Sequence, residues 1–169
     1  MSRGFVKEED QESTPMVPPR ADLPNGITNY VTAFGLQALL DEREQLQIEK
    51  DNLSFTNEQE RRIAVNFLQA KLQLLSERIA SAKVVDLNKQ PLDEIRFGAH
   101  ITLCINDQQK PERYQIVGVD EANISLHKIG FTAPIAKLLI NKKIGEKTVL
   151  KLGTKNRTFK VLAISYNQE

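Results

Sequence analysis

The spacing of the apolar residues changes near residue 83, and this change constrains the fold more than any other feature of the chain. From Thr32 to Ala82, apolar side chains recur every three or four residues, which is the period of one face of an α-helix. From Ile95 onward they recur every second residue, which is the period of a strand buried on one side. Helices followed by strands, rather than alternating with them, predict an α+β fold in which the two kinds of element are segregated.

The helical part predicts an antiparallel hairpin within residues 31–83. Thr32 is placed to cap a first helix by accepting a bond from an amide that has no intrahelical partner. The only break falls between Leu53 and Asn57, and Asn57 with Glu60 matches the capping box that opens a second helix. A break this short makes the helices antiparallel neighbours, about 30 Å long and packed as a coiled coil. The stripe that would join them comprises Leu36, Leu39, Leu40, Leu46, Leu53, Ile63, Ala64, Phe67, Leu68, Leu72, Leu75, Ile79 and Ala82.

Residues 84–169 predict a small antiparallel sheet with one short helix. Residues 95–106 alternate between apolar and polar, so they are expected to form a strand with one buried face. Thr132 is placed to cap the helix, and Pro134 stands in its first turn, where a missing amide does no harm. Further strands are expected at residues 114–117, 125–131, 148–152 and 158–166, the last two joined as a hairpin around residues 153–157.

Residues 1–30 predict a tail without regular structure. Residues 7–12 are mostly acidic, and four prolines follow between residues 15 and 24. Each proline lacks a backbone donor and restricts the residue before it. The segment also has too few apolar residues to offset the entropy lost on ordering. We therefore expect a disordered or extended, loosely adhering tail, with ordering on a partner as the alternative.

Charge and composition argue against several classes of protein. With 23 basic and 22 acidic residues, the net charge of +1 argues against a protein that wraps nucleic acid by charge alone. No apolar run approaches the roughly 20 residues of a membrane span. The single cysteine rules out an internal disulfide and suits a reducing compartment. We therefore expect a cytoplasmic protein.

Residues able to carry out chemistry are sparse. His100 and His127 are far apart, and neither has a cysteine or acid at metal-ligand spacing, so no metal site is predicted. Cys104 has no histidine or basic neighbour in sequence to activate it as a nucleophile. Residues 118–121 form a turn without the repeated glycines of a phosphate loop. No catalytic residue is predicted, and the chain is expected not to be an enzyme.

Five segments after the hairpin carry a resemblance to a known family. They are Val84 to Asp86, Phe97 to Ala99, Tyr114 to Glu121, Ala133 to Leu139 and Lys142 to Glu146. Their order and spacing, rather than any single segment, resemble the Gre-type (GreA/GreB) bacterial transcription elongation factors over roughly residues 30–166. Ala133 stands where the family usually has serine, and Asn141 stands where it often has glycine.

The resemblance implies a coiled-coil hairpin followed by an FKBP-like domain that docks on core RNA polymerase at the rim of its secondary channel. In such factors the hairpin projects towards the polymerase active site, where two acidic tip residues help to hold the second magnesium ion. The polymerase then hydrolyses its own backtracked transcript. The resemblance implies no cofactor beyond that magnesium, no membrane, no small-molecule substrate, and only indirect contact with the rest of the transcription complex.

The docking segment implied by the resemblance lies around the short helix. Thr132 and Pro134 are also the residues that a helix start requires, so docking with capping and capping alone both remain open. Lys137, with Lys142 and Lys143, offers either a basic edge for an acidic patch of the polymerase or an ordinary solvated face. The implied docking residues are Thr132, Ala133, Pro134, Ile135 and Lys137.

The hairpin tip departs from the family. The family motif there reads Gly-Asp-x-x-Glu-Asn or close to it, and residues 49–60 do not match it. The predicted arms are also several residues shorter than those of the cleavage factors. Asp51, Glu58 and Glu60 lie near the tip and are the candidates for a metal ligand or a channel contact. The alternative is that Glu58 and Glu60 stabilise the dipole of the second helix from its first turn.

Three functions therefore remain open. The first is a regulator of bacterial transcription elongation that binds RNA polymerase and inserts its hairpin into the secondary channel. Such a regulator would promote elongation or cleavage weakly, or would block the channel, as the relatives named regulator of nucleoside diphosphate kinase do. The second is a cleavage-stimulating factor that uses the tip acids. The third is a stand-alone interaction module that binds another partner through its hairpin.

Overall fold

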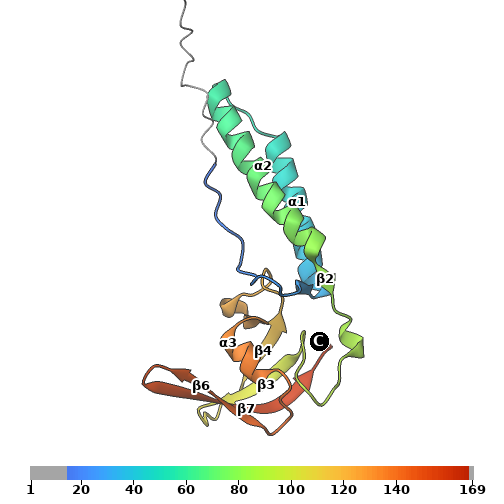
Figure 1. Cartoon of the computed structure of the whole chain (residues 1–169), viewed down its shortest axis with the longest axis vertical. Helices are drawn as coiled ribbons and strands as arrows, with labels where there is room; N and C mark the ends of the chain where they lie inside the picture. Colours follow the sequence, from blue (N-terminus) through green and yellow to red (C-terminus); the bar gives the residue numbers. More distant parts are fainter. Residues whose placement is uncertain (1–14, 168–169) are drawn as a thin grey trace, which may run out of the picture.

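The chain folds into a long helical hairpin and a curled sheet domain at the hairpin base (Figure 1). The computed structural model describes residues 15–167. Among these residues, no helix is long and apolar enough to cross a membrane. The elements in chain order are β1 (Tyr30–Val31), α1 (Ala33–Asp51), α2 (Glu58–Ser81), β2 (Lys83–Val84), η1 (Leu87–Lys89), β3 (His100–Ile105), β4 (Glu112–Val117), η2 (Ile124–Leu126), β5 (Lys128–Gly130), α3 (Pro134–Leu139), β6 (Lys147–Leu152) and β7 (Lys155–Ser165).

Helices α1 and α2 form the predicted hairpin, and both predicted caps are present. The Thr32 hydroxyl accepts a bond from the Gly35 amide at 2.9 Å, and Asn57 Oδ1 accepts one from the Gln59 amide at 2.8 Å. The buried seam is narrower than the predicted stripe, and Ile63 is 61% exposed. Each helix has one helical partner, and a two-helix seam covers only a narrow stripe. That seam consists of Leu39, Leu46, Leu68, Leu72 and Leu75.

The sheet has five strands in the order β5-β4-β3-β7-β6. The prediction of a fully antiparallel sheet is wrong at one pairing, because β4 and β5 run parallel. Residues 118–127 carry the chain back along the sheet between these strands, and parallel neighbours need such a crossover. The strand predicted at residues 125–131 is correspondingly shorter. Its first residues form the 3-10 turn η2, and His127 then adopts a left-handed conformation with φ 55°.

The central strand β3 starts five residues later than the alternation predicts. Gly98, at φ +85°, bends the chain between Ile95 and His100. A side chain there would also collide with the η1 turn, since an added Cβ would lie 2.1 Å from Leu87 Cδ2. Ile95 and Ala99 are nevertheless fully buried. The alternation therefore predicted burial correctly and the strand boundary incorrectly.

Helix α3 lies against the sheet and completes the domain core. Ala136 and Leu139 are its buried residues, and Pro134 stands at its start as predicted. The predicted cap is wrong: the N-cap is Ala133, which makes no side-chain cap bond, and Thr132 lies one residue too early. The Ala133 amide instead donates to the Gly130 carbonyl at 2.9 Å. The core cluster consists of Ile95, Ala99, Ile101, Leu103, Ile105, Ile116, Ile129, Ala136, Leu139, Phe159, Val161 and Tyr166.

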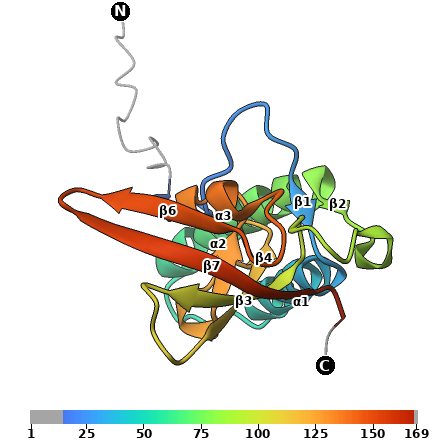
Figure 2. The same cartoon turned by 90° about the horizontal axis from the view of Figure 1, so that it is seen from below.

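Strands β6 and β7 form a ribbon that extends past the rest of the domain (Figure 2). The turn between them is only Gly153 and Thr154, so β7 begins at Lys155 rather than at residue 158. Gly153 has φ +59°, the positive value that two-residue hairpin turns require.

Residues 15–29, here called the strap, contain no helix or strand, as their prolines predict. The strap runs beside the hairpin and down to its base, where β1 begins (Figure 1). There β1 pairs with β2 in a two-stranded parallel sheet. This pairing joins the segment that enters the hairpin to the segment that leaves it. The part of the predicted tail at residues 1–14 lies outside the described residues.

Candidate functional site

The structure brings the three predicted acids to the same end of the hairpin. Asp51 ends α1, and its Oδ1 accepts a bond from Gln47 Nε2 at 2.8 Å. Glu58 opens α2, and its Oε1 lies 3.5 Å from Arg61 Nη1. Glu60 follows in the same turn and is exposed. Asp51 and Glu58 thus each lie beside a polar partner in their own helix.

These acids do not combine into a metal site. Within residues 15–167, no group of three or more His, Cys, Asp or Glu side chains could hold a metal ion. Glu58 and Glu60 occupy the first turn of α2, where carboxylates stabilise the helix dipole. Glu58 has a side chain that is 73% exposed, so its carboxylate is open to solvent. Acids arranged in this way can offer single ligands to an ion held by another molecule.

The loop between the helices adds an apolar element to the tip. Phe55 is 43% exposed, whereas Leu53 packs partly against the hairpin seam. The end of the hairpin therefore presents an aromatic ring among charges of both signs, contributed by Asp51, Glu58 and Arg61.

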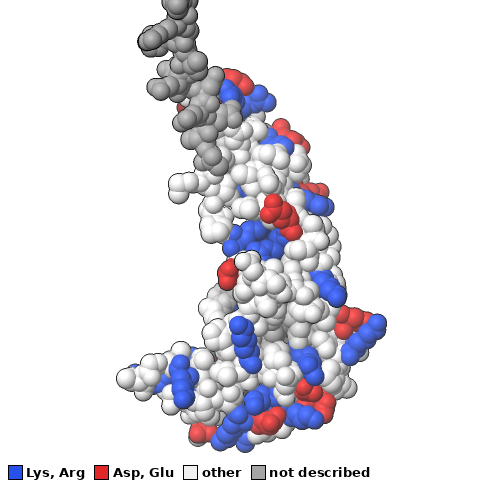
Figure 3. All heavy atoms as spheres, viewed as in Figure 1, with Lys and Arg blue, Asp and Glu red and all other residues white. Residues whose placement is uncertain are grey.

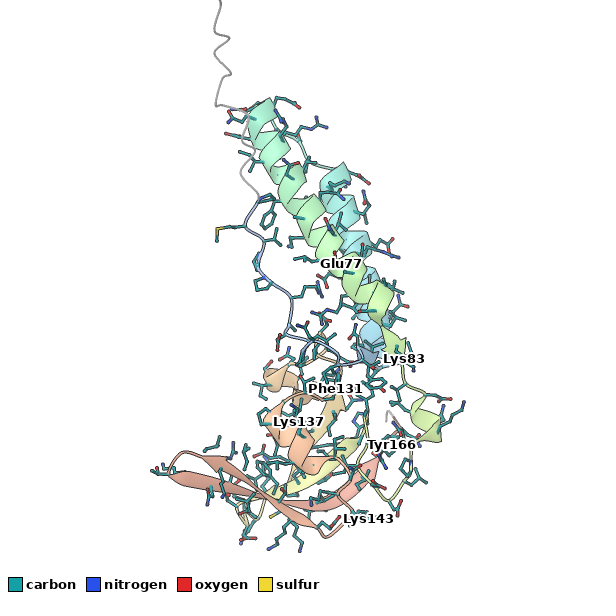
Figure 4. The ribbon with its side chains drawn as sticks, viewed as in Figure 1. Glu77, Lys83, Phe131, Lys137, Lys143 and Tyr166 are labelled. Carbon is teal, nitrogen blue, oxygen red and sulfur yellow. The ribbon has the colours of Figure 1, made fainter. Side chains whose placement is uncertain are left out.

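The predicted docking segment forms the turn into α3. Pro134 and Lys137 are exposed, whereas Ala133 and Ile135 pack partly against the domain core. Thr132 is half-buried just before this turn. Figure 4 shows Lys137 on α3, with Phe131 nearer to the hairpin base. Of the five predicted docking residues, two are thus exposed and three are half-buried.

The lysines near α3 do not make a uniformly basic edge. Lys143 Nζ lies 3.4 Å from Asp93 Oδ2, and the Lys143 amide donates to Glu146 Oε2 at 2.5 Å. Lys142 is half-buried, and its carbonyl accepts a bond from the Ile95 amide at 2.9 Å. Figure 3 likewise shows basic and acidic side chains intermixed over the visible face of the domain.

The hairpin base meets the sheet domain through three aromatic rings. The Tyr30 ring centroid lies 6.0 Å from that of Phe97 and 5.8 Å from that of Phe131, and Phe97 and Phe131 are 5.6 Å apart. Beside them, β1 closely approaches the end of β4. A Cβ on Gly118 would lie 2.7 Å from the Tyr30 carbonyl oxygen, so only glycine fits here without a shift.

Thr32 also links the hairpin to the domain. While it caps α1, its hydroxyl donates to Glu121 Oε2 at 2.6 Å. The other oxygen of Glu121 lies 2.9 Å from Lys128 Nζ, and that ammonium group sits 4.3 Å from the centre of the Phe34 ring. One buried cap thus joins the first turn of α1 to the loop after β4 and to β5.

A cluster of four charged residues lies beside this junction, between the strap, both helices and the loop after β4. Arg20 of the strap donates to both carboxylate oxygens of Glu42 on α1, at 2.9 and 3.0 Å, and to Asp120 Oδ1 at 3.0 Å. Arg78 of α2 lies 3.3 Å from Asp120 Oδ2 and donates to the Ala21 carbonyl of the strap at 2.6 Å. The hydrogen bond to Glu42 raises the pKa of Arg20, so the guanidinium stays charged.

Sequence reasoning missed this cluster. Arg20 lies in a segment predicted as a tail, and Asp120 and Glu121 lie in a segment predicted only as a turn. The separation of 100 residues between Arg20 and Asp120 leaves no local pattern from which the contact could be found. The only signal in the sequence was an arginine within a proline-rich segment.

The histidines and the cysteine take structural positions. His127 stacks on Tyr114 with ring centroids 4.8 Å apart, and its Nδ1 lies 3.0 Å from the Arg113 carbonyl oxygen. Burial raises the pKa of Tyr114, and the hydrogen bond to Glu112 raises it further. His100 and Cys104 are half-buried in β3, and Cys104 is a free thiol.

Comparison with known proteins identifies the family. The profile described as "Transcription elongation factor, GreA/GreB, C-term" matches residues 89–166. The transcription elongation factor GreA of Acidiphilium cryptum is 34% identical over 116 residues, which span 69% of this chain and 72% of that protein. The chain belongs to the GreA/GreB family of transcription elongation factors. The GreA of Halorhodospira halophila is 30% identical over 132 residues, 78% of this chain and 81% of that protein.

Some matches within this family are shorter. With the GreA of Maricaulis maris the chain shares 30% identity over 100 residues, and it spans 64% of that protein's length. Among solved structures, the GreA/GreB factor of Nitrosomonas europaea aligns with a TM-score of 0.42 and 16% identity, covering 81% of this chain and 98% of that one. The Gfh1 protein of Thermus thermophilus aligns with a TM-score of 0.39 and 18% identity, covering 82% and 99%. The family assignment rests on the sequence matches.

Proposed function

We propose that this protein regulates bacterial transcription elongation by binding RNA polymerase through its sheet domain and inserting its hairpin into the secondary channel. The observation that carries the proposal is the shape of the molecule. The chain belongs to the GreA/GreB family, and its hairpin stands clear of the sheet domain along most of its length (Figure 1). A projection of this kind suits a narrow channel.

The dimensions of the hairpin support this role. Helix α2 has 24 residues, and a rise of 1.5 Å per residue makes it about 36 Å long. Its seam buries five leucines, so the two helices form one rod rather than two independent arms. Such a rod delivers its tip to a site tens of ångströms from the docking surface.

The chemistry of the tip favours channel occupancy over delivery of a metal ion. Asp51 and Glu58 each lie beside a polar partner in their own helix, and residues 49–60 lack the acidic motif of the cleavage factors. A carboxylate must come within about 2–2.5 Å of a magnesium ion to coordinate it, which demands precise placement. We infer that the tip, with Phe55 exposed among these charges, acts chiefly by filling space near the active site.

Docking is assigned to the turn into α3. Pro134 and Lys137 are exposed there, and Ala133 and Ile135 hold the turn against the core. A rigid backbone turn with one cation suits a complementary acidic surface, because preorganised contacts lose little entropy on binding.

Binding to core RNA polymerase tests the docking proposal. We expect the protein to be retained by immobilised core enzyme at low salt, where electrostatic contacts are strongest. Lys137→Glu should weaken retention severalfold. The control is Lys89→Glu, which reverses a lysine with an 82% exposed side chain on η1, away from α3. Failure of the unmodified protein to bind at low salt would rule out the proposal, and equal losses in both variants would move the docking surface away from α3.

A second assay distinguishes channel occupancy from stimulated cleavage. Backtracked transcription complexes are incubated with magnesium, with the protein present or absent. We expect little stimulated cleavage and a slowing of nucleotide addition that rises with protein concentration. Strong cleavage that disappears in the combined Asp51→Ala, Glu58→Ala and Glu60→Ala variant would instead establish the tip acids as metal ligands.

A further inference from the structure

The strap makes a contact far from the point at which the hairpin joins the domain. Arg20 reaches from Asp120, in the loop after β4, to Glu42 on α1. Glu42 lies nine residues after Ala33, the first residue of α1, which places it about 14 Å along the helix axis. We propose that Arg20 is a positioning residue, and that through it the strap braces the hairpin at a set angle to the docking domain.

The other contacts at the junction lie close to the pivot. Tyr30, Thr32 and Gly35 are within one turn of the start of α1. Tyr30 contacts Phe131 and approaches the end of β4, whereas Thr32 and Gly35 lie against Glu121. Contacts at a pivot resist translation strongly and rotation weakly, because their lever arm is short. Arg78, which also binds Asp120, lies only three residues before the end of α2.

The lever arm gives the brace its effect. Helix α1 has 19 residues and is about 28 Å long, so Glu42 lies roughly halfway to the tip. A movement of about 1 Å at Glu42 therefore becomes about 2 Å at the tip. That displacement matters for any contact made inside a narrow channel or with a bound ion.

The geometry of Arg20 suits this task. Its guanidinium donates two bonds to Glu42 and a third to Asp120, and this planar fork fixes direction as well as distance. The side chain of Arg20 is 19% exposed and that of Asp120 is 7% exposed, so the link to the domain is shielded from solvent. Elsewhere the strap borders an open hollow against α2, lined by Val17, Leu23 and Leu74.

The role assigned to Arg20 rests on the proposed function, because the hairpin angle matters only if the tip works at a distance from the docking surface. Its physical basis can be tested without polymerase. Spin labels are placed on cysteines introduced at Ser54, in the tip loop, and at Ala163, an exposed position on β7, in a Cys104→Ser background. Pulsed electron-spin measurements then give the distribution of distances between tip and domain.

Arg20→Ala should broaden this distribution, or shift its centre, by several ångströms. Arg20→Lys keeps the positive charge and loses the planar guanidinium group. Its distance distribution should lie between those of Arg20→Ala and the unmodified protein. The matched control is Arg61→Ala, which removes an arginine paired within α2 at the far end of the hairpin and should leave the distribution unchanged. Thermal melting of each variant confirms that the fold persists.

The same variants separate positioning from docking. Arg20→Ala should bind core polymerase as tightly as the unmodified protein and should alter transcription severalfold less. An unchanged distance distribution in Arg20→Ala would overturn the brace, whatever the polymerase result. Failure of the unmodified protein to bind polymerase would instead overturn the proposed function and leave the distance measurement valid.

Discussion

Tyr166 follows β7 and connects it to the segment before β3 (Figure 4). Removal of its hydroxyl group tests how much this connection stabilises the fold. The hydroxyl donates to the Glu94 carbonyl at 2.5 Å and accepts from the Arg96 amide at 2.8 Å. The residue is 5% exposed, and it belongs to the core cluster. Tyr166→Phe removes both bonds while leaving the ring in place.

The expected cost follows from the two partners left behind. Loss of a partner from a buried polar group costs about 1–3 kcal/mol, and here one carbonyl and one amide lose theirs. Because both partners are in a loop near the surface, water will satisfy part of the loss, and we expect about 2–4 kcal/mol in the free energy of unfolding. For a domain of this size, each kcal/mol corresponds to roughly 2–4 °C in melting temperature.

The variant should also change the response to alkaline pH. Burial raises the pKa of Tyr166, and its bond from the Arg96 amide opposes that shift only in part. A group whose pKa is higher in the folded state than in the unfolded state stabilises the fold below the unfolded value, about 10 for tyrosine. That stabilisation is lost as the pH rises through the folded value. The unmodified protein should therefore lose stability above about pH 10 more steeply than Tyr166→Phe does.

Urea denaturation at pH 7 and at several values between pH 9 and 11 tests both statements. Tyr114→Phe is the comparison at pH 7, because that hydroxyl bonds the side chain of Glu112 rather than two backbone groups and its removal should cost less. Burial raises the pKa of Tyr114 too, so this variant should also lessen the alkaline loss of stability. A Tyr166→Phe protein as stable as the unmodified one at pH 7, with the same alkaline slope, would refute the account of these two bonds.

Two further substitutions test the hairpin and its junction. Leu75→Ala leaves a cavity at a fully buried position in the hairpin seam and should lower the free energy of unfolding by about 2–5 kcal/mol in chemical denaturation. The exposed Ile63→Ala should lower it by under about 1 kcal/mol, and equal losses in the two variants would show that the seam does not stabilise the fold. Gly118→Ala places a Cβ 2.7 Å from the Tyr30 carbonyl oxygen, so it should lower the free energy of unfolding by about 1–3 kcal/mol and shift the tip-to-domain distance. Gly145→Ala, at a position open to solvent, should leave that distance unchanged.

Local patterns in the sequence predicted the elements well where the interactions are local. Thr32 and Asn57 were placed as helix caps from residue type and spacing, and both make the predicted bonds. A cap needs only partners two or three residues away, so its evidence lies within a short window. The prediction that Thr132 caps α3 is wrong, because the Ala133 amide donates to the Gly130 carbonyl and Ala133 is the N-cap.

Interactions between distant segments could not be predicted in this way. The parallel pairing of β4 with β5 depends on the path of residues 118–127, of which 118–121 read as an ordinary turn and 125–127 as the start of a strand. The seam of the hairpin was predicted too broadly, since residues such as Ile63 match the helical period and still face solvent. The helical period of the apolar residues shows which of them share a face of the helix. Whether they are buried depends on what packs against that face.

The sequence by itself determined the α+β class, the hairpin with its caps, and the segments that mark the Gre-type family. All of these depend on spacing within a few turns of the chain. Only the tertiary structure decided that Arg20 contacts Glu42 and Asp120. The physical reason is the distance along the chain between these residues. Whether charged groups meet depends on how separate elements are oriented, and that orientation is set by the packing at Tyr30, Gly118 and the strap rather than by any local pattern.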